Sequence, residues 1–370
     1  MHLEELDLRN FRSWETFDVH FSSTSSLILG SNGTGKSNIL EAICLLATSR
    51  SFRNALDQKM VQWGKDGYLV KGIFFLESGR QDIAIEYSGG NKTLLINGVQ
   101  ERRISSIIGI VYCVLFSFED IYLIVGSPSV RRSFLDLILC SVDSLYLRNL
   151  RTYVNVIRQK NRYLKETFEI DQNLLSAWNE QLIPTGAYLI QKRTSLIDFI
   201  NSYVEYAVNS LGEKLIFPFR LSYRTNVTPG DDHEGALRRT LEEKMEKELQ
   251  FKTSLVGPHR DDFRYSDGKY EIRHFGSVGE ARLASILLKL AQGEFYRETR
   301  GVVPILLIDD ILLELDMENM EKVLSLFMAG GQRIITTTER RKLPEIFSFD
   351  QVFKVEKRGE ASALQCGPSL

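Results

Sequence analysis

One octapeptide carries most of what the sequence says about the architecture of this chain: Gly30-Ser31-Asn32-Gly33-Thr34-Gly35-Lys36-Ser37. It matches the P-loop pattern G-x-x-x-x-G-K-[ST] at every fixed position. The apolar residues 26–29 precede it and predict a buried strand, and residues 38–48 follow it with apolar side chains at helical spacing. A strand, a glycine-rich turn and a helix N-terminus form the context that a phosphate site requires. We therefore predict phosphate binding rather than a chance glycine-rich turn.

The octapeptide offers two kinds of ligand to a nucleotide. Its backbone N–H groups and the helix dipole attract an anion. Lys36 is expected to reach the β- and γ-phosphates, and the Ser37 hydroxyl is expected to bind Mg²⁺. The predicted cofactors are ATP and Mg²⁺, and the predicted binding residues of this loop are Gly30, Ser31, Asn32, Gly33, Thr34, Gly35, Lys36 and Ser37.

An acidic pair ends the apolar run 303–308. A buried parallel strand with this pattern places its carboxylates at the edge of the sheet where a P-loop also lies. We assign Asp309 to the Mg²⁺ shell and Asp310 to activation of the attacking water, so that Lys36, Asp309 and Asp310 are the candidate catalytic residues. The alternative interpretation is an acidic start to the following helix.

A second candidate anion site lies in residues 275–282, FGSVGEAR, ahead of a predicted helix over residues 283–295. Here Ser277 and Gly279 stand at a helix N-terminus, where backbone N–H groups bind anions. Because the P-loop already supplies one such site, a second one suggests a nucleotide held between two subunits. The segment LELD, residues 313–316, is a candidate for the same seam.

Length and composition predict a soluble, cytoplasmic protein of about two domains. The chain has 370 residues, of which 43% are hydrophobic, and its net charge of −2 neither favours nor excludes a nucleic-acid partner. The four scattered cysteines indicate a reducing compartment, with three of them in apolar surroundings. The N-terminal residues do not have the pattern of a signal segment, and no apolar run approaches 18 residues, so no membrane partner is expected.

The pattern of elements predicts an α/β fold with an inserted, mainly helical arm. The composition changes near Ser127-Pro128, and residues 129–212 are almost wholly helical in pattern. We predict a head of residues 1–127 and 251–370, and an arm of residues 128–250. The expected strands and hairpins are 3–21, 68–75, 82–87, 93–96, 107–116, 215–223, 253–258 with a turn at 267–268, 302–308 and 333–338, and the expected further helices are 189–211 after a kink or break at Pro184, 235–250 and 317–328.

One predicted arm helix has a basic face opposite an apolar stripe. On a helical projection the stripe contains Tyr146, Leu150, Tyr153, Ile157 and Leu164. The usual interpretation of such a face is solvation, and the alternative is a surface that follows DNA phosphates. The cations of this face, called the basic stripe below, are Arg148, Arg151, Arg158, Arg162 and Lys165.

Two other functions are excluded by spacing. The triplet His259-Arg260-Asp261 is similar to a kinase catalytic loop, but Ser266 stands near the place of the required Asn, and no kinase glycine-rich loop is present. The scattered histidines have no metal-ligand spacing, so zinc is not expected.

Taken together, these segments make the sequence resemble the RecF family of the ABC/SMC-type ATPases. The matching segments, in the family's order, are LRNFRSWE (8–15), the P-loop, TSRSFR (48–53), FSFEDIYLIVGSP (116–128), RRSFLD (131–136), LVGPHRDDF (255–263), FGSVGE (275–280) and PILLIDDILLELD (304–316). The resemblance implies a P-loop ABC-type ATPase head, ATP-dependent homodimerisation and binding of single- and double-stranded DNA, including gapped junctions. It also implies cooperation with RecO and RecR to load RecA at single-strand gaps during DNA replication, recombination and the SOS response.

The resemblance also assigns roles. Ser277 and Gly279 match the signature motif, which closes over the γ-phosphate of the partner subunit, whereas Glu280 and Ala281 depart from the glutamines usual in this family. Leu313 stands where a serine is frequent. The family's Q-loop falls at Glu119 and Asp120, and no switch histidine stands in residues 336–338, where transporter ATPases have one.

The sequence therefore predicts a slow, DNA-stimulated ATPase that acts as a switch in DNA repair. One alternative is the ATPase subunit of an ABC transporter, which the missing histidine and the basic stripe disfavour. A condensin-like structural ATPase is another, but residues 129–250 are too short and too interrupted for a long coiled coil.

Overall fold

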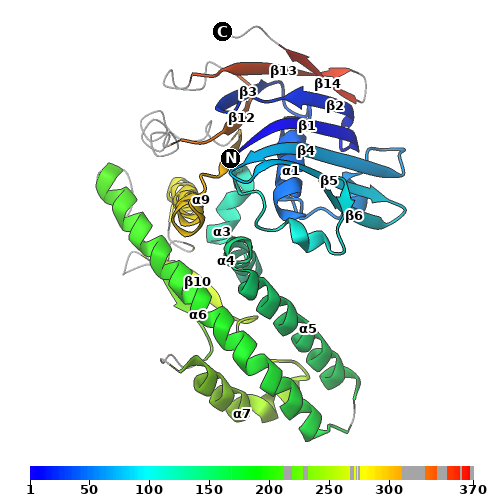
Figure 1. Cartoon of the computed structure of the whole chain (residues 1–370). Helices are drawn as coiled ribbons and strands as arrows, with labels where there is room; N and C mark the ends of the chain where they lie inside the picture. The colour runs from blue at the N-terminus through cyan, green and yellow to red at the C-terminus, as the bar shows by residue number, and fades with distance from the viewer. Residues whose placement is uncertain are drawn as a thin grey trace. The chain divides into compact units, whose positions relative to one another are not determined.

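The computed structural model describes residues 1–167, 169–211, 219–227, 232–266, 271, 273, 276–310, 330–339, 348–358 and 361–366. The chain divides into two compact units, Met1–Asp120 with Ile286–Leu370, and Ile121–Ser285. The first unit is mixed α/β and the second is mainly helical, which agrees with the predicted class (Figure 1). The division into a head of residues 1–127 and 251–370 and an arm of residues 128–250 stays a prediction.

The first unit contains an antiparallel sheet that begins with the predicted N-terminal hairpin. Alternating apolar residues form its strands, because one face of each strand is buried. The turn Ser88-Gly89-Gly90-Asn91 joins two of them, with both glycines at positive φ. The strands, in spatial order, are β2 (Trp14–His20), β1 (His2–Phe11), β4 (Gly67–Leu76), β5 (Gly79–Ser88), β6 (Asn91–Ile96) and β7 (Val99–Gln100).

A second sheet of the same unit is parallel except at one edge, where the last two strands form an antiparallel hairpin. Its central strands are buried along almost their whole length, as expected for strands covered on both faces. The strands, in spatial order, are β14 (Ala361–Cys366), β13 (Gln351–Arg358), β3 (Ser25–Leu29), β12 (Arg333–Thr337), β11 (Ile305–Asp309) and β8 (Cys113–Phe116).

Helix α1 (Lys36–Thr48) packs against strands of both sheets, and Figure 1 shows it beside β4 and β5. Ten of its thirteen residues are buried, so it is apolar almost all round and forms the centre of the core. Two short turns complete the unit before Asp120, α2 (Asp57–Met60) and η1 (Ile104–Ile107). Three cysteines, Cys44, Cys113 and Cys140, are buried thiols, as predicted.

The second unit is built on long helices that run beside one another (Figure 1). Gly186 lies where α6 passes between two others: a Cβ there would come within 2.9 Å of Leu237 and 3.1 Å of Tyr153. A two-stranded antiparallel sheet completes the unit. The elements are η2 (Phe118–Ile121), which enters it, α3 (Tyr122–Val125), α4 (Pro128–Val142), α5 (Ser144–Glu166), α6 (Gln172–Leu211), β9 (Arg220–Arg224), α7 (His233–Phe251), β10 (Asp262–Ser266) and α9 (Val278–Arg300), which ends in the first unit.

The predicted break at Pro184 is wrong, because α6 runs through it without interruption, and a kink there stays a prediction. A proline inside a helix costs about 3 kcal/mol. Pro184 is exposed, so the carbonyl that it leaves without an N–H partner lies on the side facing water. Its neighbours Leu182 and Ile183 are buried, and their packing beside the proline keeps the helix continuous.

Two predicted strands are also corrected. The run 107–116 is a strand only from Cys113, because Gly109 turns the chain at φ 85°. The segment 253–258 is not a strand, because Gly257 has φ 117° and approaches the Tyr153 hydroxyl so closely that a Cβ would lie 2.3 Å from it. The predicted turn at 267–268, the helix over 317–328, the start of the 215–223 strand and Leu313 lie outside the described residues. None of the described helices is long and apolar enough to cross a membrane.

A buried polar network ties the helices of the second unit to the segment after α7. The Arg193 guanidinium is buried and donates to Asp136 (2.8 Å), to the Tyr146 hydroxyl (3.0 Å) and to the carbonyl of Pro258 (2.7 Å). Because a buried arginine needs a partner for each N–H direction, this arrangement specifies one packing of α4, α5 and α6.

His259 sits in the same network as a neutral ring. Its Nδ1 accepts from the Tyr153 hydroxyl at 2.7 Å, and its Nε2 donates to the Ser254 carbonyl at 3.2 Å. Burial lowers the pKa of His259 to about 4, and neighbouring cations, Arg260 first, act in the same direction. An unfolded histidine has a pKa near 6.5.

This difference predicts how the stability of the second unit depends on pH. Between about pH 6.5 and pH 4 the unfolded chain binds a proton at His259 that the folded chain does not, so stability falls as the pH falls through this window. His259→Gln should flatten the dependence there by up to about 3 kcal/mol. Urea unfolding of both proteins across this pH range measures it; parallel curves for the two would contradict the prediction.

Candidate nucleotide-binding site

The sheet register brings the predicted site residues of the first unit to one edge. β12 lies between β3 and β11, and all three strands are parallel. The P-loop follows Leu29, Asp309 pairs with Thr336 in register, and Thr337 pairs with Leu29. The carboxyl ends of neighbouring parallel strands form the crevice where α/β proteins bind ligands.

The glycines of the octapeptide are required by conformation and by space. Gly33 and Gly35 have φ values of 78° and 99°. A Cβ on Gly35 would lie 2.5 Å from Ser13 Oγ and 2.7 Å from Ser362 Oγ, and a Cβ on Gly30 would lie 2.6 Å from the Val355 carbonyl. The turn is therefore packed tightly against β13 and β14.

Lys36 is buried inside this turn. Its Nζ donates to the carbonyls of Gly30 (2.8 Å) and Ser31 (3.2 Å), and it lies 3.6 Å from Asp310 Oδ2. The ammonium group is thus held at the mouth of the loop by carbonyl oxygens. A phosphate competes with such acceptors well, because hydrogen bonds between charged groups are the stronger ones.

Ser37 and Asp309 lie together, as predicted. The Ser37 hydroxyl donates to Asp309 Oδ1 at 2.8 Å, and the Thr336 hydroxyl donates to the same oxygen at 2.7 Å. Burial raises the pKa of the Asp309 carboxyl, and the two hydroxyl donors oppose this shift. A serine hydroxyl beside a carboxylate is a donor set that fits Mg²⁺, which prefers oxygen ligands.

Asp310 is strained and has an oxygen without a partner. It takes φ 50°, a conformation that costs a non-glycine residue about 1 kcal/mol or more. Its Oδ1 is buried and has no hydrogen-bond partner among the described residues. Strain and an orphaned acceptor are typical of a residue held ready for a ligand.

These residues line a cavity of about 340 Å³. Three of its walls are not predicted by the motifs. Ser13 accepts from Asn38 Nδ2 at 3.0 Å, and Asn38 accepts from Arg53 at 3.2 Å. Ser13 and Arg53 stand in the matched segments 8–15 and 48–53, which are the one signal in the sequence that could have found them. The full lining is Ser13, Asn32, Gly33, Gly35, Lys36, Ser37, Asn38, Arg53 and Asp310.

The chain matches the model of the "RecF/RecN/SMC N terminal domain" family over residues 2–361. It is 34% identical over 345 residues to the DNA replication and repair protein RecF of Halalkalibacterium halodurans, and the match covers 91% of this chain and 93% of that protein. This chain belongs to the RecF family. The predicted resemblance is confirmed, and with it the assignment to RecF-type DNA replication and repair.

Solved structures give the same answer. The structure of the recombination mediator protein RecF-ATP in the RecFOR pathway superposes with a TM-score of 0.87 at 29% identity, covering 95% of each chain. An Smc head bound to the C-winged helix domain of ScpA matches with a TM-score of 0.55 at 17% identity, over 99% of this chain and 97% of that one, which shows a shared fold alone.

The predicted signature residues, Ser277 and Gly279, lie in the second unit at the start of α9, which begins five residues earlier than predicted. The Ser277 hydroxyl accepts from the Glu280 backbone N–H at 3.2 Å, and the Glu280 carboxylate accepts from the Ser277 N–H at 2.6 Å. This is a capping box, in which two end groups satisfy each other. Gly279 is exposed, and the nearest atom to a Cβ placed there is Ser277 Oγ at 4.0 Å.

Of the predicted Q-loop pair, Asp120 interacts with residues outside the nucleotide cavity. It accepts from the Ser117 N–H at 2.7 Å and lies 3.5 Å from Lys289 Nζ. Burial raises the pKa of its carboxyl, and the Lys289 cation opposes this shift. Glu119 is exposed.

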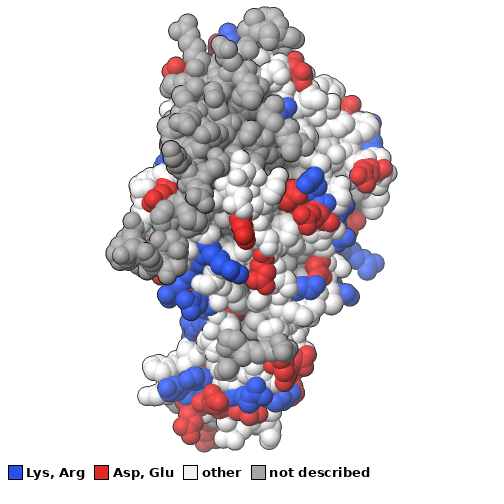
Figure 2. Space-filling model, turned by 90° about the vertical axis from the view of Figure 1, so that its left-hand side faces the viewer, with Lys and Arg blue, Asp and Glu red and all other residues white. Residues whose placement is uncertain are grey.

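The basic stripe keeps its predicted orientation on α5 with one refinement. Arg148, Arg158 and Lys165 are exposed and Arg151 is half-buried. Arg162 forms an ion pair with Glu166 at 2.9 Å. Figure 2 shows that side chains of both signs are mixed on one face of the protein, in line with the low net charge.

Lys160, which the stripe omits, lies on the buried side of α5. It donates to Glu248 at 2.6 Å and to Asn179 at 2.8 Å, and both members of the ion pair are buried. Its role is therefore to join α5 to α6 and α7.

A buried carboxylate of the P-loop helix joins it to the segments that carry Arg12 and Ser51. Glu41 of α1 is fully buried and accepts two hydrogen bonds from Arg12, at 2.6 and 2.9 Å. The Ser51 hydroxyl donates to the same carboxylate, and Arg53 lies 3.8 Å from it. This cluster fixes the segment 48–53 against α1.

Arg12→Met should destabilise the first unit by about 3 kcal/mol, because it leaves the buried Glu41 carboxylate without its main partner. The double variant Arg12→Met with Glu41→Met should lose less than Arg12→Met alone, because no uncompensated charge remains. Urea denaturation midpoints measure both. A double variant less stable than the single one would contradict the prediction.

Proposed function

We propose that this chain is an ATP-controlled DNA-binding protein of recombinational DNA repair, in which ATP joins two copies and slow hydrolysis releases them. One observation carries the proposal: Lys36, Ser37 and Asp310 line one cavity, and Asp309 is bonded to Ser37 at its edge. A cation, a hydroxyl and two carboxylates at the end of parallel strands are the groups that phosphoryl transfer requires. The similarity to RecF-ATP supports ATP as the nucleotide.

Each site residue has a role in this proposal. The loop N–H groups and Lys36 bind the phosphates, and Ser37 with Asp309 would hold Mg²⁺, which neutralises phosphate charge when bound. Thr336 orients Asp309 through its 2.7 Å hydrogen bond. Asp310, whose Oδ1 has no partner among the described residues, accepts from the attacking water. In this proposal the rate of hydrolysis sets how long the dimer persists, so we expect a kcat well below the median enzyme value of about 10 s⁻¹.

The partner subunit completes the site in this proposal. The head is of the ABC-ATPase type, and Ser277 and Gly279 of one copy close over the γ-phosphate bound by the other. The capping box orders this helix N-terminus before a phosphate arrives. RecO and RecR are proposed as partners, since the matched structures belong to the RecFOR pathway, with RecA loading as the outcome.

The dimer can be tested with two variants that differ in their expected effect on ATP binding. Wild type should elute as a monomer without nucleotide and as a dimer with ATP at micromolar concentration. Lys36→Ala should lose ATP binding and the dimer together. Gly279→Leu should keep ATP binding, because a Cβ there meets no atom of its own chain closer than 4.0 Å. It should lose the dimer, because the larger side chain would stand between this helix N-terminus and the phosphate bound by the other copy. Gel filtration and a nucleotide-binding assay measure both; a monomer under all conditions would refute the shared site.

DNA binding by the basic stripe has its own test. Arg148→Glu with Arg158→Glu should weaken DNA binding and leave ATP binding intact. The slope of log K against log salt should also flatten by about 0.9 for each phosphate that the variant no longer neutralises. Arg239→Glu with Lys247→Glu on α7 is the matched control, with the same charge change on two exposed cations. Equal DNA affinity of the stripe variant and the control at low salt would contradict DNA binding by the stripe and favour the interpretation that this face is only solvated.

A further inference from the structure

The most exposed aromatic side chain of the described residues stands on the rim of a groove that the nucleotide site does not use. Trp63 is 93% exposed, whereas Trp14 is fully buried. An indole costs free energy when it is left in water, and exposed Trp is enriched where a partner covers it. The groove has a volume of about 500 Å³ and is lined by Gln58, Val61, Gln62, Trp63, Gly64, Lys65, Asp66, Tyr87, Gly89 and Gly90.

One wall of the groove is joined firmly to the antiparallel sheet. The Arg12 N–H donates to the Met60 carbonyl at 2.7 Å, and the Gln62 N–H donates to the Asn10 carbonyl at 2.8 Å. Met60 is buried, and the Lys65 N–H closes a turn on the Gln62 carbonyl at 3.1 Å. The segment that presents Trp63 is therefore held in place at its base, which reduces the entropy cost of binding.

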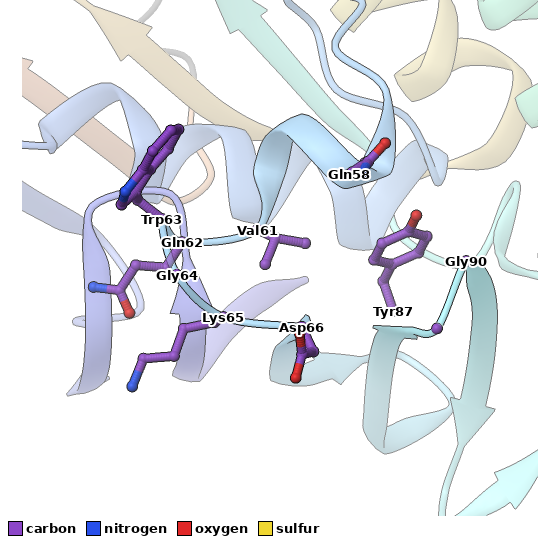
Figure 3. Close-up of a pocket in the computed structure, with 10 residues that line it drawn as sticks. Gln58, Val61, Gln62, Trp63, Gly64, Lys65, Asp66, Tyr87 and Gly90 are labelled. Carbon is purple, nitrogen blue, oxygen red and sulfur yellow. The ribbon is translucent and has the colours of Figure 1, made fainter.

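The opposite wall is equally well supported. Tyr87 of β5 stacks on Tyr68 with ring centres 5.6 Å apart, and Tyr68 meets Phe11 edge to face at 5.3 Å. The Tyr68 hydroxyl donates to Asp57 at 2.6 Å. Figure 3 shows Trp63 at one end of the groove and Tyr87 with Gly90 at the other, with Val61 between them. The groove thus offers two separated aromatic rings on a rigid frame.

Two exposed cations, Lys59 and Lys65, stand on either side of Trp63 in the chain, and the lining itself holds Lys65 and one carboxylate, Asp66. Asp57 is already neutralised by Lys92, 2.7 Å away. The Lys65 ion pair with Glu15, at 3.0 Å, is exposed on both sides, so it is weak and easily exchanged for a phosphate.

We propose that this groove binds an unpaired segment of single-stranded DNA, with bases stacked on Trp63 and Tyr87 and phosphates on Lys59 and Lys65. Aromatic platforms beside a basic rim are how proteins hold single strands without reading their sequence. Duplex DNA does not fit this chemistry, because its base faces are already stacked. The inference rests on the proposed DNA-binding function and adds to it a strand type and a location.

The test uses the full-length protein, a short labelled oligo(dT) and a duplex in parallel, at low salt. Oligo(dT) should quench tryptophan emission, because the exposed Trp63 dominates the response to solutes while Trp14 is buried and Trp178 packs on Tyr163. Trp63→Ala should weaken oligo(dT) binding about tenfold and leave duplex and ATP binding unchanged. Trp63→Phe should weaken it less, because a phenyl ring still stacks. Tyr206→Ala, at an exposed aromatic of the second unit, is the matched control and should bind as wild type.

Each outcome decides the matter. If Trp63→Ala binds oligo(dT) as wild type does, the groove proposal is overturned while the proposed function stands. The same holds if Trp63→Ala weakens the duplex and oligo(dT) equally, since a general loss is not stacking. If wild type binds neither oligo(dT) nor duplex, the DNA-binding function fails and the groove proposal fails with it.

Discussion

The candidate nucleotide site depends on one oxygen atom, Oδ1 of Asp309. It receives hydrogen bonds from Ser37 on the P-loop helix and from Thr336 on the neighbouring strand. These two donors come from segments far from β11 in the chain, so the atom joins three elements at the edge of the parallel sheet. The strand order β3-β12-β11 makes the junction possible, because it places three carboxyl ends side by side. Without that order, the P-loop and the acidic pair would be separate motifs.

Much of this site could be predicted because local sequence patterns determine it. The octapeptide, the apolar run before Asp309 and the helix after Ser37 each predict their own conformation from spacing. Thr336 was not predicted as a site residue, since nothing local distinguishes it from another threonine in a buried strand. Only the register with Asp309 gives it a role. Ser13 and Arg53 were missed for the same reason: they reach the cavity through tertiary packing.

The second unit shows where local patterns fail. Pro184 predicted a break, yet the buried residues beside it keep α6 intact. The segment before His259 has strand-like composition, yet Gly257 bends there to accommodate the Tyr153 hydroxyl. In both cases a tertiary contact outweighs a propensity of a few kcal/mol at most. The polar motif around His259 is similar to a catalytic triplet, but its histidine is engaged by its neighbours as part of a buried scaffold.

The tight packing of Ser362 against the P-loop bears on how this chain is made. The Ser362 hydroxyl donates to the Thr34 carbonyl at 2.6 Å, and its N–H donates to the Ser13 carbonyl at 3.0 Å. Asp309, Thr336 and Ser362 lie 272, 299 and 325 residues after Ser37, so they leave the ribosome long after the P-loop. A nascent chain can therefore form the helices of the inserted unit early, from local contacts, but it cannot complete the phosphate cradle until the last strands arrive. We therefore expect that a chain can bind a nucleotide only after β14 has been synthesised.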